Sequence, residues 1–108
     1  MANELLTETT FQLEKDFLNI GLNFNIQKPV RNYNQLFSFT TNLVNLLNEQ
    51  EPKRILNLLY RIDLSEEKVQ SEMQISPLTF SELLAELIVK RELQKVIMKN
   101  YYSKPENQ

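Results

Sequence analysis

The chain contains no cysteine and no histidine, and each absence excludes a class of chemistry. Without cysteine there is neither a disulfide framework nor a thiol nucleophile. Without histidine there is no imidazole base, no Ser-His pair and no ordinary zinc site. A single glycine leaves no phosphate-binding loop and no dinucleotide fingerprint. We therefore expect no catalytic residue, no cofactor-binding residue and no metal ligand, and we predict that the protein is not an enzyme.

Long apolar runs are also missing. The longest, between Leu83 and Val89, is interrupted by Glu86, whereas a membrane-spanning helix needs ~20 apolar residues. The N-terminal segment MANELLTETT lacks the basic and apolar regions of a secretory signal. Together with the absence of cysteine, these features predict a soluble, cytoplasmic protein that has no membrane partner.

The chain does contain enough apolar material for one core, since 42% of its 108 residues are hydrophobic. Pro29, Pro52 and Pro77 divide it at points where apolar residues at helical spacing stop and start again. We therefore predict an all-α fold with a single domain over residues 1–108. It should be a compact bundle of four or five helices with a long central C-terminal helix, and residues 1–8 and 103–108 should fray.

The first quarter of the chain predicts a helix followed by an extended segment. Residues 10–20 carry three apolar side chains at core spacing: Leu13, Phe17 and Ile20. An earlier start, through Leu5 and Leu6, is an alternative. Residues 22–27 alternate between apolar and polar, which is the spacing of a strand. Because no second strand is predicted, we expect these residues to lie extended across the helices.

Two helices are predicted in the middle of the chain. Residues 33–48 form the first, capped by Asn32. Its predicted inward side chains are Leu36, Phe39, Leu43, Leu46 and Leu47. The next helix has Pro52 at its first position and ends at Ile62 or Asp63. Its predicted inward side chains are Ile55, Leu56, Leu59 and Ile62.

A short fourth helix should start after Ser65, which is a favoured cap, and end near Ile75, because Pro77 disfavours helical geometry at the residue before it. Leu64 and Val69 can pack together across its first turn as a hydrophobic staple. The connection between the third and fourth helices superficially suggests a helix-turn-helix. The acidic residues of the fourth helix would repel phosphate, so we reject that interpretation.

The fifth helix, residues 79–101, begins at a capping box formed by Thr79 and Glu82. Its apolar residues occupy two faces about half a turn apart. The first face contains Phe80, Leu83, Leu84, Leu87 and Ile88, and the second contains Val89, Leu93, Val96 and Ile97. We expect the first face in the core. The second is either covered by the other helices or is a candidate interface for a homodimer or another protein partner.

Arg91 lies on the core side of this helix, so its stem should pack on the core and its guanidinium should reach a carboxylate. Asp63 and Glu51 are the candidates. We favour a structural ion pair between Arg91 and Asp63 over a ligand-binding role. If the pair is partly buried, removing the acid alone should destabilise the fold more than Arg91→Leu does.

Glu82 and Glu86 are four residues apart on the same helix, a spacing that carboxylate metal sites use. No Glu-x-x-His pair accompanies them, because the chain has no histidine. We therefore interpret them as a solvated acidic face on which Glu86 pairs with Lys90.

Two segments place charged residues among apolar ones: Leu-Tyr-Arg-Ile-Asp at positions 59–63 and Arg-Glu-Leu-Gln-Lys at positions 91–95. These segments resemble stretches of short, all-helical bacterial proteins of uncharacterised function. The resemblance covers roughly residues 55–101. It implies a helical fold, and it implies no activity, substrate or site residue.

The net charge of −2 gives no general attraction to nucleic acid, but the charge is unevenly distributed. Residues 64–89 carry five acidic groups and one basic group, or −4, whereas residues 90–108 carry five basic and two acidic groups, or +3. We predict a small, non-enzymatic protein-interaction or assembly module that uses its C-terminal helix. The alternative is a weak nucleic-acid-binding protein in which Tyr101 and Tyr102 stack on bases beside the basic C-terminal end.

Overall fold

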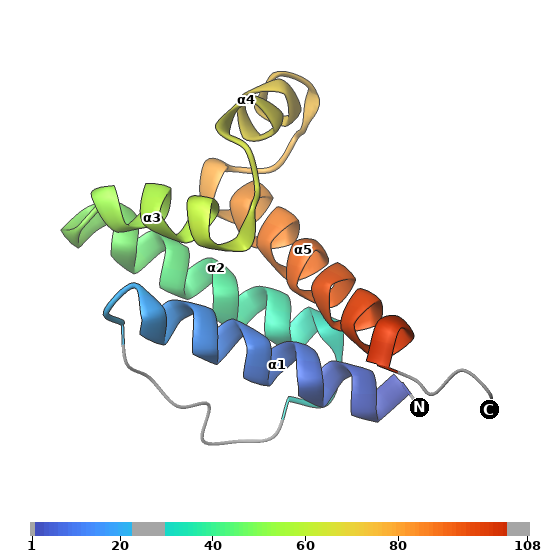
Figure 1. The fold of residues 1–108 in the computed structure, drawn as a ribbon. Coiled ribbons are helices and arrows are strands. Elements are labelled where there is room, and N and C mark those ends of the chain that lie inside the picture. Colours follow the sequence, from blue (N-terminus) through green and yellow to red (C-terminus); the bar gives the residue numbers. More distant parts are fainter. Residues whose placement is uncertain (1, 23–29, 104–108) are drawn as a thin grey trace.

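The computed structural model describes residues 2–22 and 30–103, and all regular secondary structure in that part of the chain is helical (Figure 1). The helices are α1 (Ala2–Asn19), α2 (Tyr33–Gln50), α3 (Lys53–Ile62), α4 (Glu66–Ile75) and α5 (Phe80–Ser103). The all-α class, the number of helices and the long C-terminal helix are thus confirmed. Of the described helices, none is long and apolar enough to span a membrane.

The long helix α5 is central to the packing, because it contacts each of the other four helices. Figure 1 shows α1 and α2 lying along α5, while α4 projects from the end at which α5 begins. The start of α1 lies beside the end of α5, where Asn100 Nδ2 donates a hydrogen bond to Glu8 Oε1 at 3.0 Å. The two helices are therefore antiparallel.

All five helices contribute to one core. Its fully or nearly fully buried side chains include Leu13, Phe17, Leu36, Val44, Leu58, Ile62, Val69, Leu84 and Ile88. Burying a side chain of this size stabilises the fold by roughly 1.5–3 kcal/mol relative to leaving it exposed. The amphipathic spacing of the helices thus accounts for how one continuous core forms.

The first helix begins at Ala2, so the predicted start at residue 10 is wrong and the alternative start through Leu6 is right. Leu6 is buried seven residues before Leu13, which is two helical turns. The hydroxyl of Thr10 donates to the carbonyl oxygen of Leu6 at 2.9 Å and is thereby satisfied inside the helix. Residues 2–8 belong to α1 and residues 104–108 lie outside the described part; the fraying of both ends stays a prediction.

The predicted starts of α2, α4 and α5 are confirmed by their hydrogen bonds. Asn32 and Ser65 each accept a bond from the backbone amide three residues on. At the start of α5, the amide of Glu82 donates to Thr79 Oγ1 at 3.2 Å, and the amide of Thr79 donates to Glu82 Oε1 at 3.0 Å. Local polar chemistry therefore fixes where three of the helices begin.

Two predicted core residues are exposed. Leu46 and Leu56 are 41% and 49% exposed, and Val44 and Leu58 are buried instead. The inward face of α2 includes Thr40, which is fully buried. Its hydroxyl donates to the carbonyl oxygen four residues earlier at 2.8 Å, so no polar group is left unsatisfied there. A threonine that satisfies its hydroxyl in this way can take a core position, so the apolar pattern alone misplaced the face by part of a turn.

The chain leaves α1 through Gly21, whose φ of +90° favours glycine over any residue with a side chain. Arg54 Nη1, from α3, donates to the carbonyl oxygen of Gly21 at 3.0 Å and holds this turn against the bundle. Leu22 packs partly against the core. The rest of the alternating segment predicted to be extended, residues 23–27, lies outside the described residues.

Candidate functional site

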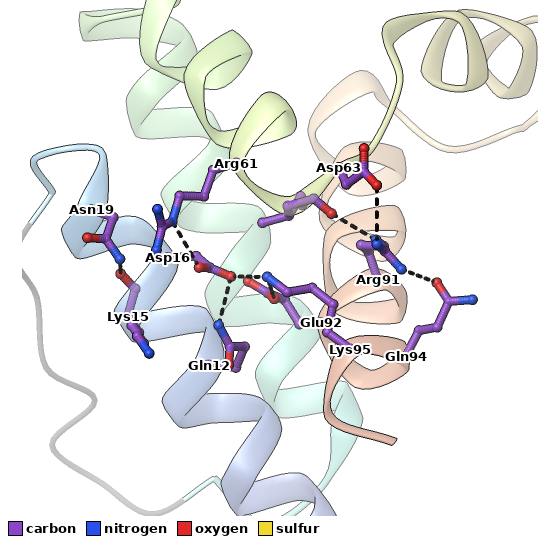
Figure 2. A network of polar contacts seen from close by, with 11 residues as sticks. Gln12, Lys15, Asp16, Asn19, Arg61, Asp63, Arg91, Glu92, Gln94 and Lys95 are labelled. Atoms are coloured by element: carbon purple, nitrogen blue, oxygen red, sulfur yellow. Dashed lines mark hydrogen bonds and ion pairs between the residues drawn. The ribbon is translucent and has the colours of Figure 1, made fainter. Parts of the chain in front are cut away.

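Two acidic side chains meet inside the interface between α1 and α5 (Figure 2). Asp16 and Glu92 are 1% and 0% exposed. Asp16 follows Leu13 by three residues on the inward face of α1, and Glu92 lies midway between Ile88 and Val96 on α5. Helical spacing carries both acids into the core along with these apolar neighbours.

Side chains from three helices bind the Asp16 carboxylate. Lys95 Nζ of α5 lies 2.7 Å from Oδ2, Arg61 Nε of α3 lies 3.3 Å from Oδ1, and Gln12 Nε2 of α1 lies 3.2 Å from Oδ2. Figure 2 shows these donors converging on Asp16 from different sides. One carboxylate therefore ties α1 to both α3 and α5.

Glu92 is in a different position, because neither of its oxygens accepts a well-aligned hydrogen bond from the described residues. Its nearest cation, Lys95 Nζ, lies 3.3 Å from Oε1. Burial, and then the hydrogen bond and negative charge of Asp16, raise the pKa of Glu92 to about 9, although Lys95 opposes this shift. A pKa of about 9 favours the neutral form of Glu92 at pH 7, and in that form one of its oxygens can donate to the Asp16 carboxylate.

The same contacts act in the opposite direction on Asp16. Burial alone would raise its pKa, but hydrogen bonds from Glu92, Lys95 and Gln12 hold that pKa below its ordinary value. The pair thus consists of one neutral acid and one carboxylate. In an open cleft this arrangement could transfer protons to and from a substrate. Here both groups are buried, so their chemistry serves to join helices.

On another side of α5, Arg91 makes the predicted ion pair, with Nη2 3.7 Å from Asp63 Oδ2. Its closer partners are the carbonyl oxygen of Ile62, 2.8 Å from Nε, and Gln94 Oε1, 2.7 Å from Nη1. The alternative acid, Glu51, pairs with a different arginine. The predicted contact between Arg91 and Asp63 is therefore present, and whether it stabilises the helix packing stays a prediction.

The expectation that this pair is partly buried fails on the side of the acid. Asp63 ends α3 with a φ of +62°, in the left-handed region, and its side chain is 92% exposed. Water can therefore replace Asp63 as a partner of Arg91. The hydrogen bond from Arg91 to the carbonyl oxygen of Ile62 is then the more important contact for stability. We therefore expect Arg91→Leu to destabilise the fold more than removal of the Asp63 carboxylate, which reverses the predicted order.

A groove of about 920 Å³ lies between α3, α4 and the first half of α5, and we call it the α3–α4–α5 groove. Its apolar lining is Leu56, Leu59, Tyr60, Leu64 and Leu87. The acidic residues along it are Asp63, Glu66, Glu72 and Glu86, and the basic ones are Lys68, Lys90 and Arg91. Glu86 Oε1 lies 3.9 Å from Lys90 Nζ, as the sequence predicted.

The structure changes the interpretation of the candidate interface. Val89 and Val96 are buried within the single chain and Leu93 is partly buried, because α1 and α2 pack against α5. Val89 and Val96 therefore cannot form an exposed seam, and of the two alternatives left open by the sequence the covered second face holds for them. Ile97 is 48% exposed and remains available.

A different set of apolar side chains is exposed at the end of α5. Ile97, Met98, Tyr101 and Tyr102 are 48%, 47%, 73% and 77% exposed. The rings of Tyr101 and Tyr102 pack edge to face, with their centroids 5.0 Å apart. We call these four residues the C-terminal apolar patch.

The buried carboxyl pair was not predicted from the sequence, although a signal for it was present. Asp16 and Glu92 occupy positions that the apolar periodicity assigns to the inward faces of their helices. An acid at such a position must be paired, hydrogen-bonded or neutral. Lys95, three residues after Glu92, was a visible candidate, but the spacing could not show that α1 would supply the second acid.

Among the described residues, no cluster of three or more potential metal ligands could hold a metal ion. Comparison of the chain with protein-family models, curated proteins and solved structures finds no match. The resemblance to helical bacterial proteins therefore stays a prediction.

Proposed function

We propose that this protein is a non-enzymatic interaction module that binds another protein chain through the C-terminal apolar patch and the adjoining α3–α4–α5 groove. The exposure of the patch is the observation that carries the proposal. Its residues form two pairs, Ile97 with Tyr101 and Met98 with Tyr102, each one helical turn apart. Adjacent large apolar side chains at a surface are typical of protein-binding sites.

A non-enzymatic role is supported by where the acid–base chemistry lies. Asp16 and Glu92 have the separated pKa values that a catalytic pair would need, yet both are closed off between α1 and α5. The α3–α4–α5 groove is lined instead by apolar and charged side chains, and two of its ion pairs are Glu86 with Lys90 and Asp63 with Arg91. An apolar floor of Leu56, Leu59 and Leu87 with charged side chains around it matches the apolar centre and polar rim of protein interfaces.

The alternative of nucleic-acid binding has weaker support. Lys95, one of the cations expected to meet phosphate, is held by Asp16 at 2.7 Å. Tyr101 and Tyr102 are exposed and could stack on bases, but they lie edge to face rather than as parallel platforms. The same two rings serve better as anchors in a protein interface, where tyrosine is enriched.

The proposal can be tested with a matched pair of double variants. Met98→Ser with Tyr101→Ser removes the patch, whereas Phe11→Ser with Leu18→Ser removes comparably exposed side chains from α1. A partner captured by the wild-type chain would be identified, purified and titrated against all three proteins. We expect at least tenfold weaker binding for the patch variant and unchanged binding for the α1 variant, with equal helicity by circular dichroism. Equal affinities would overturn the proposal.

A further inference from the structure

Helix α4 has fewer attachments to the bundle than any other helix. Val69 is its one buried residue, and among the rest only Glu72 is partly covered. No side chain of α4 forms a hydrogen bond or an ion pair with the described part of another helix. Its main packing partner is α5, and Figure 1 shows it projecting from the bundle. The docking of α4 therefore depends chiefly on one valine.

The other helices are held to α5 more firmly. Asp16 joins α1 to α5 through Lys95, and Arg91 joins α5 to α3 through the carbonyl oxygen of Ile62. Helix α2 packs along α5 and buries four of its own side chains. Elements with few buried apolar contacts are the ones that open at the lowest free energy. By this criterion α4 should open before the rest of the fold.

The chain is anchored on both sides of α4. Leu64, just before the helix, is buried, and its amide donates to the carbonyl oxygen of Leu59 at 2.9 Å. Leu78, just after the helix, packs partly against the core, and the capping box at Thr79 follows it. Residues 65–77 can therefore leave the bundle while both of their ends stay in place.

We propose that α4 opens by itself, so that Val69 leaves the core and the helix unravels while α1, α2, α3 and α5 stay packed. A helix on its own needs ~12–15 residues to be even marginally stable in water. The ten residues of α4 fall short of this length, so α4 stays helical only while it is docked on α5.

The opening of α4 would control the α3–α4–α5 groove. Glu66, Lys68 and Glu72 form the α4 wall of the groove, opposite residues of α3 and α5 such as Leu59 and Leu87. This step rests on the proposed function, in which a partner chain uses the groove. A partner that fills the groove contacts α4 and selects its docked form, so the apparent affinity falls with the fraction of molecules in which α4 is open. Helix α4 is thus a gate that regulates the binding site.

The absence of native cysteine allows one thiol to report the opening. Val69→Cys places the thiol on α4, and Val89→Cys is the matched control on α5, because the two valines are 6% and 7% exposed. Both variants would be labelled with a thiol-reactive disulfide reagent after circular dichroism has shown equal helicity. We expect Val69→Cys to react at least tenfold faster than Val89→Cys, since local opening is more frequent than global unfolding.

Urea separates local from global opening in the same experiment. The labelling rate of Val69→Cys should change little at low urea, because the opening of α4 exposes little surface, whereas the rate of Val89→Cys should rise steeply. Equal rates with the same dependence on urea would mean that α4 opens only when the whole fold unfolds. That result would overturn the proposal.

Hydrogen exchange of the unmodified chain makes the test independent of both substitutions. We expect the amides of residues 70–74 to exchange at least tenfold faster than those in the middle of α2. Equal protection of the two helices would overturn the opening of α4 and, because no partner is used, would leave binding through the groove standing. Fast exchange in α4 together with equal partner affinities for the wild-type chain and the Met98→Ser, Tyr101→Ser variant would keep the opening and overturn the binding function.

Discussion

Arg91 and Glu92 are consecutive residues, yet they take part in two ionic contacts of opposite character. Glu92 is buried with Asp16 and Lys95, and its surroundings keep it protonated at neutral pH. Arg91 reaches Asp63, whose side chain is almost fully exposed. Neighbouring side chains on a helix point about 100° apart, so Glu92 faces the interior while Arg91 faces the surface.

The comparison shows that burial, more than the presence of opposite charges, decides what an ionic contact contributes. An exposed pair typically contributes 0–1 kcal/mol, because water competes for both partners. Removing one partner of a buried pair can cost about 3–5 kcal/mol, because the other charge is left without solvent or counterion. The same substitution at the two sites should therefore have very different effects.

The largest effect is expected for Asp16→Asn. This change preserves the size of the side chain but removes the anion that binds Lys95 and Arg61. Glu92 can replace it only by ionising inside the core, which is costly. We expect the free energy of unfolding at pH 7 to fall by about 3 kcal/mol, measured by urea denaturation. A loss below about 1 kcal/mol would mean that solvent reaches the site.

The next effect concerns pH and Glu92. Its folded-state pKa of about 9 lies above the ordinary value of 4.5, so it stabilises the fold fully below pH 4.5 and loses this contribution as pH rises toward 9. The Asp16 pKa is lowered, so its contribution is lost only as pH falls below about its ordinary 3.8. The pH range over which Glu92 loses its contribution to stability therefore does not overlap the range over which Asp16 loses its own.

Glu92→Gln should therefore flatten the dependence of stability on pH. A single group contributes at most about 1.4 kcal/mol per pH unit, which caps the gain of the variant over wild type between pH 5 and pH 8 at about 4 kcal/mol. We expect about half of this, roughly 2 kcal/mol, because a buried site relaxes when its carboxyl ionises. Glu86→Gln, at a partly exposed position on the same helix, is the control and should keep the wild-type slope. Parallel curves for wild type and Glu92→Gln would show that Glu92 is already ionised at pH 5.

The helices could be predicted from sequence because their signals are local. Thr79 and Glu82 are three residues apart, so their reciprocal hydrogen bonds follow from spacing alone. Asn32 and Ser65 were found for the same reason. The start of α1 was placed too late, because threonine favours helix ends, whereas the hydroxyls of Thr9 and Thr10 each donate to a carbonyl oxygen four residues earlier inside the helix.

The buried site could be predicted only in part, because it depends on contacts between distant helices. Asp16 and Lys95 are separated by 79 positions, and no periodicity within one helix pairs them. The pair of Arg91 with Asp63 was predicted, but its exposure was not. Exposure depends on how α4 leaves the bundle, which is a property of the assembled fold.

A smaller effect is expected at the start of α5, where the contact is exposed but satisfies a backbone amide. Thr79→Ala removes the hydroxyl that accepts from the amide of Glu82. We expect a loss of about 1 kcal/mol, between the buried and the exposed ion pair. Thr7→Ala, at an exposed position inside α1, controls for helix propensity and should be neutral or slightly stabilising. Equal losses for both variants would rule out a specific capping effect.

The smallest effect is expected for Asp63→Asn, the counterpart of Asp16→Asn. Asparagine tolerates the left-handed conformation of this position, so the substitution removes the charge without adding backbone strain. Because water can take the place of Asp63 beside Arg91, stability should stay within about 0.5 kcal/mol of wild type. Arg91→Leu should cost more than Asp63→Asn, since it also leaves the carbonyl oxygen of Ile62 without its 2.8 Å donor. Urea denaturation of Asp16→Asn and Asp63→Asn at one pH would measure the difference in stability between the buried and the exposed site. Similar losses at both positions would show that charge, and not burial, sets the strength of these contacts.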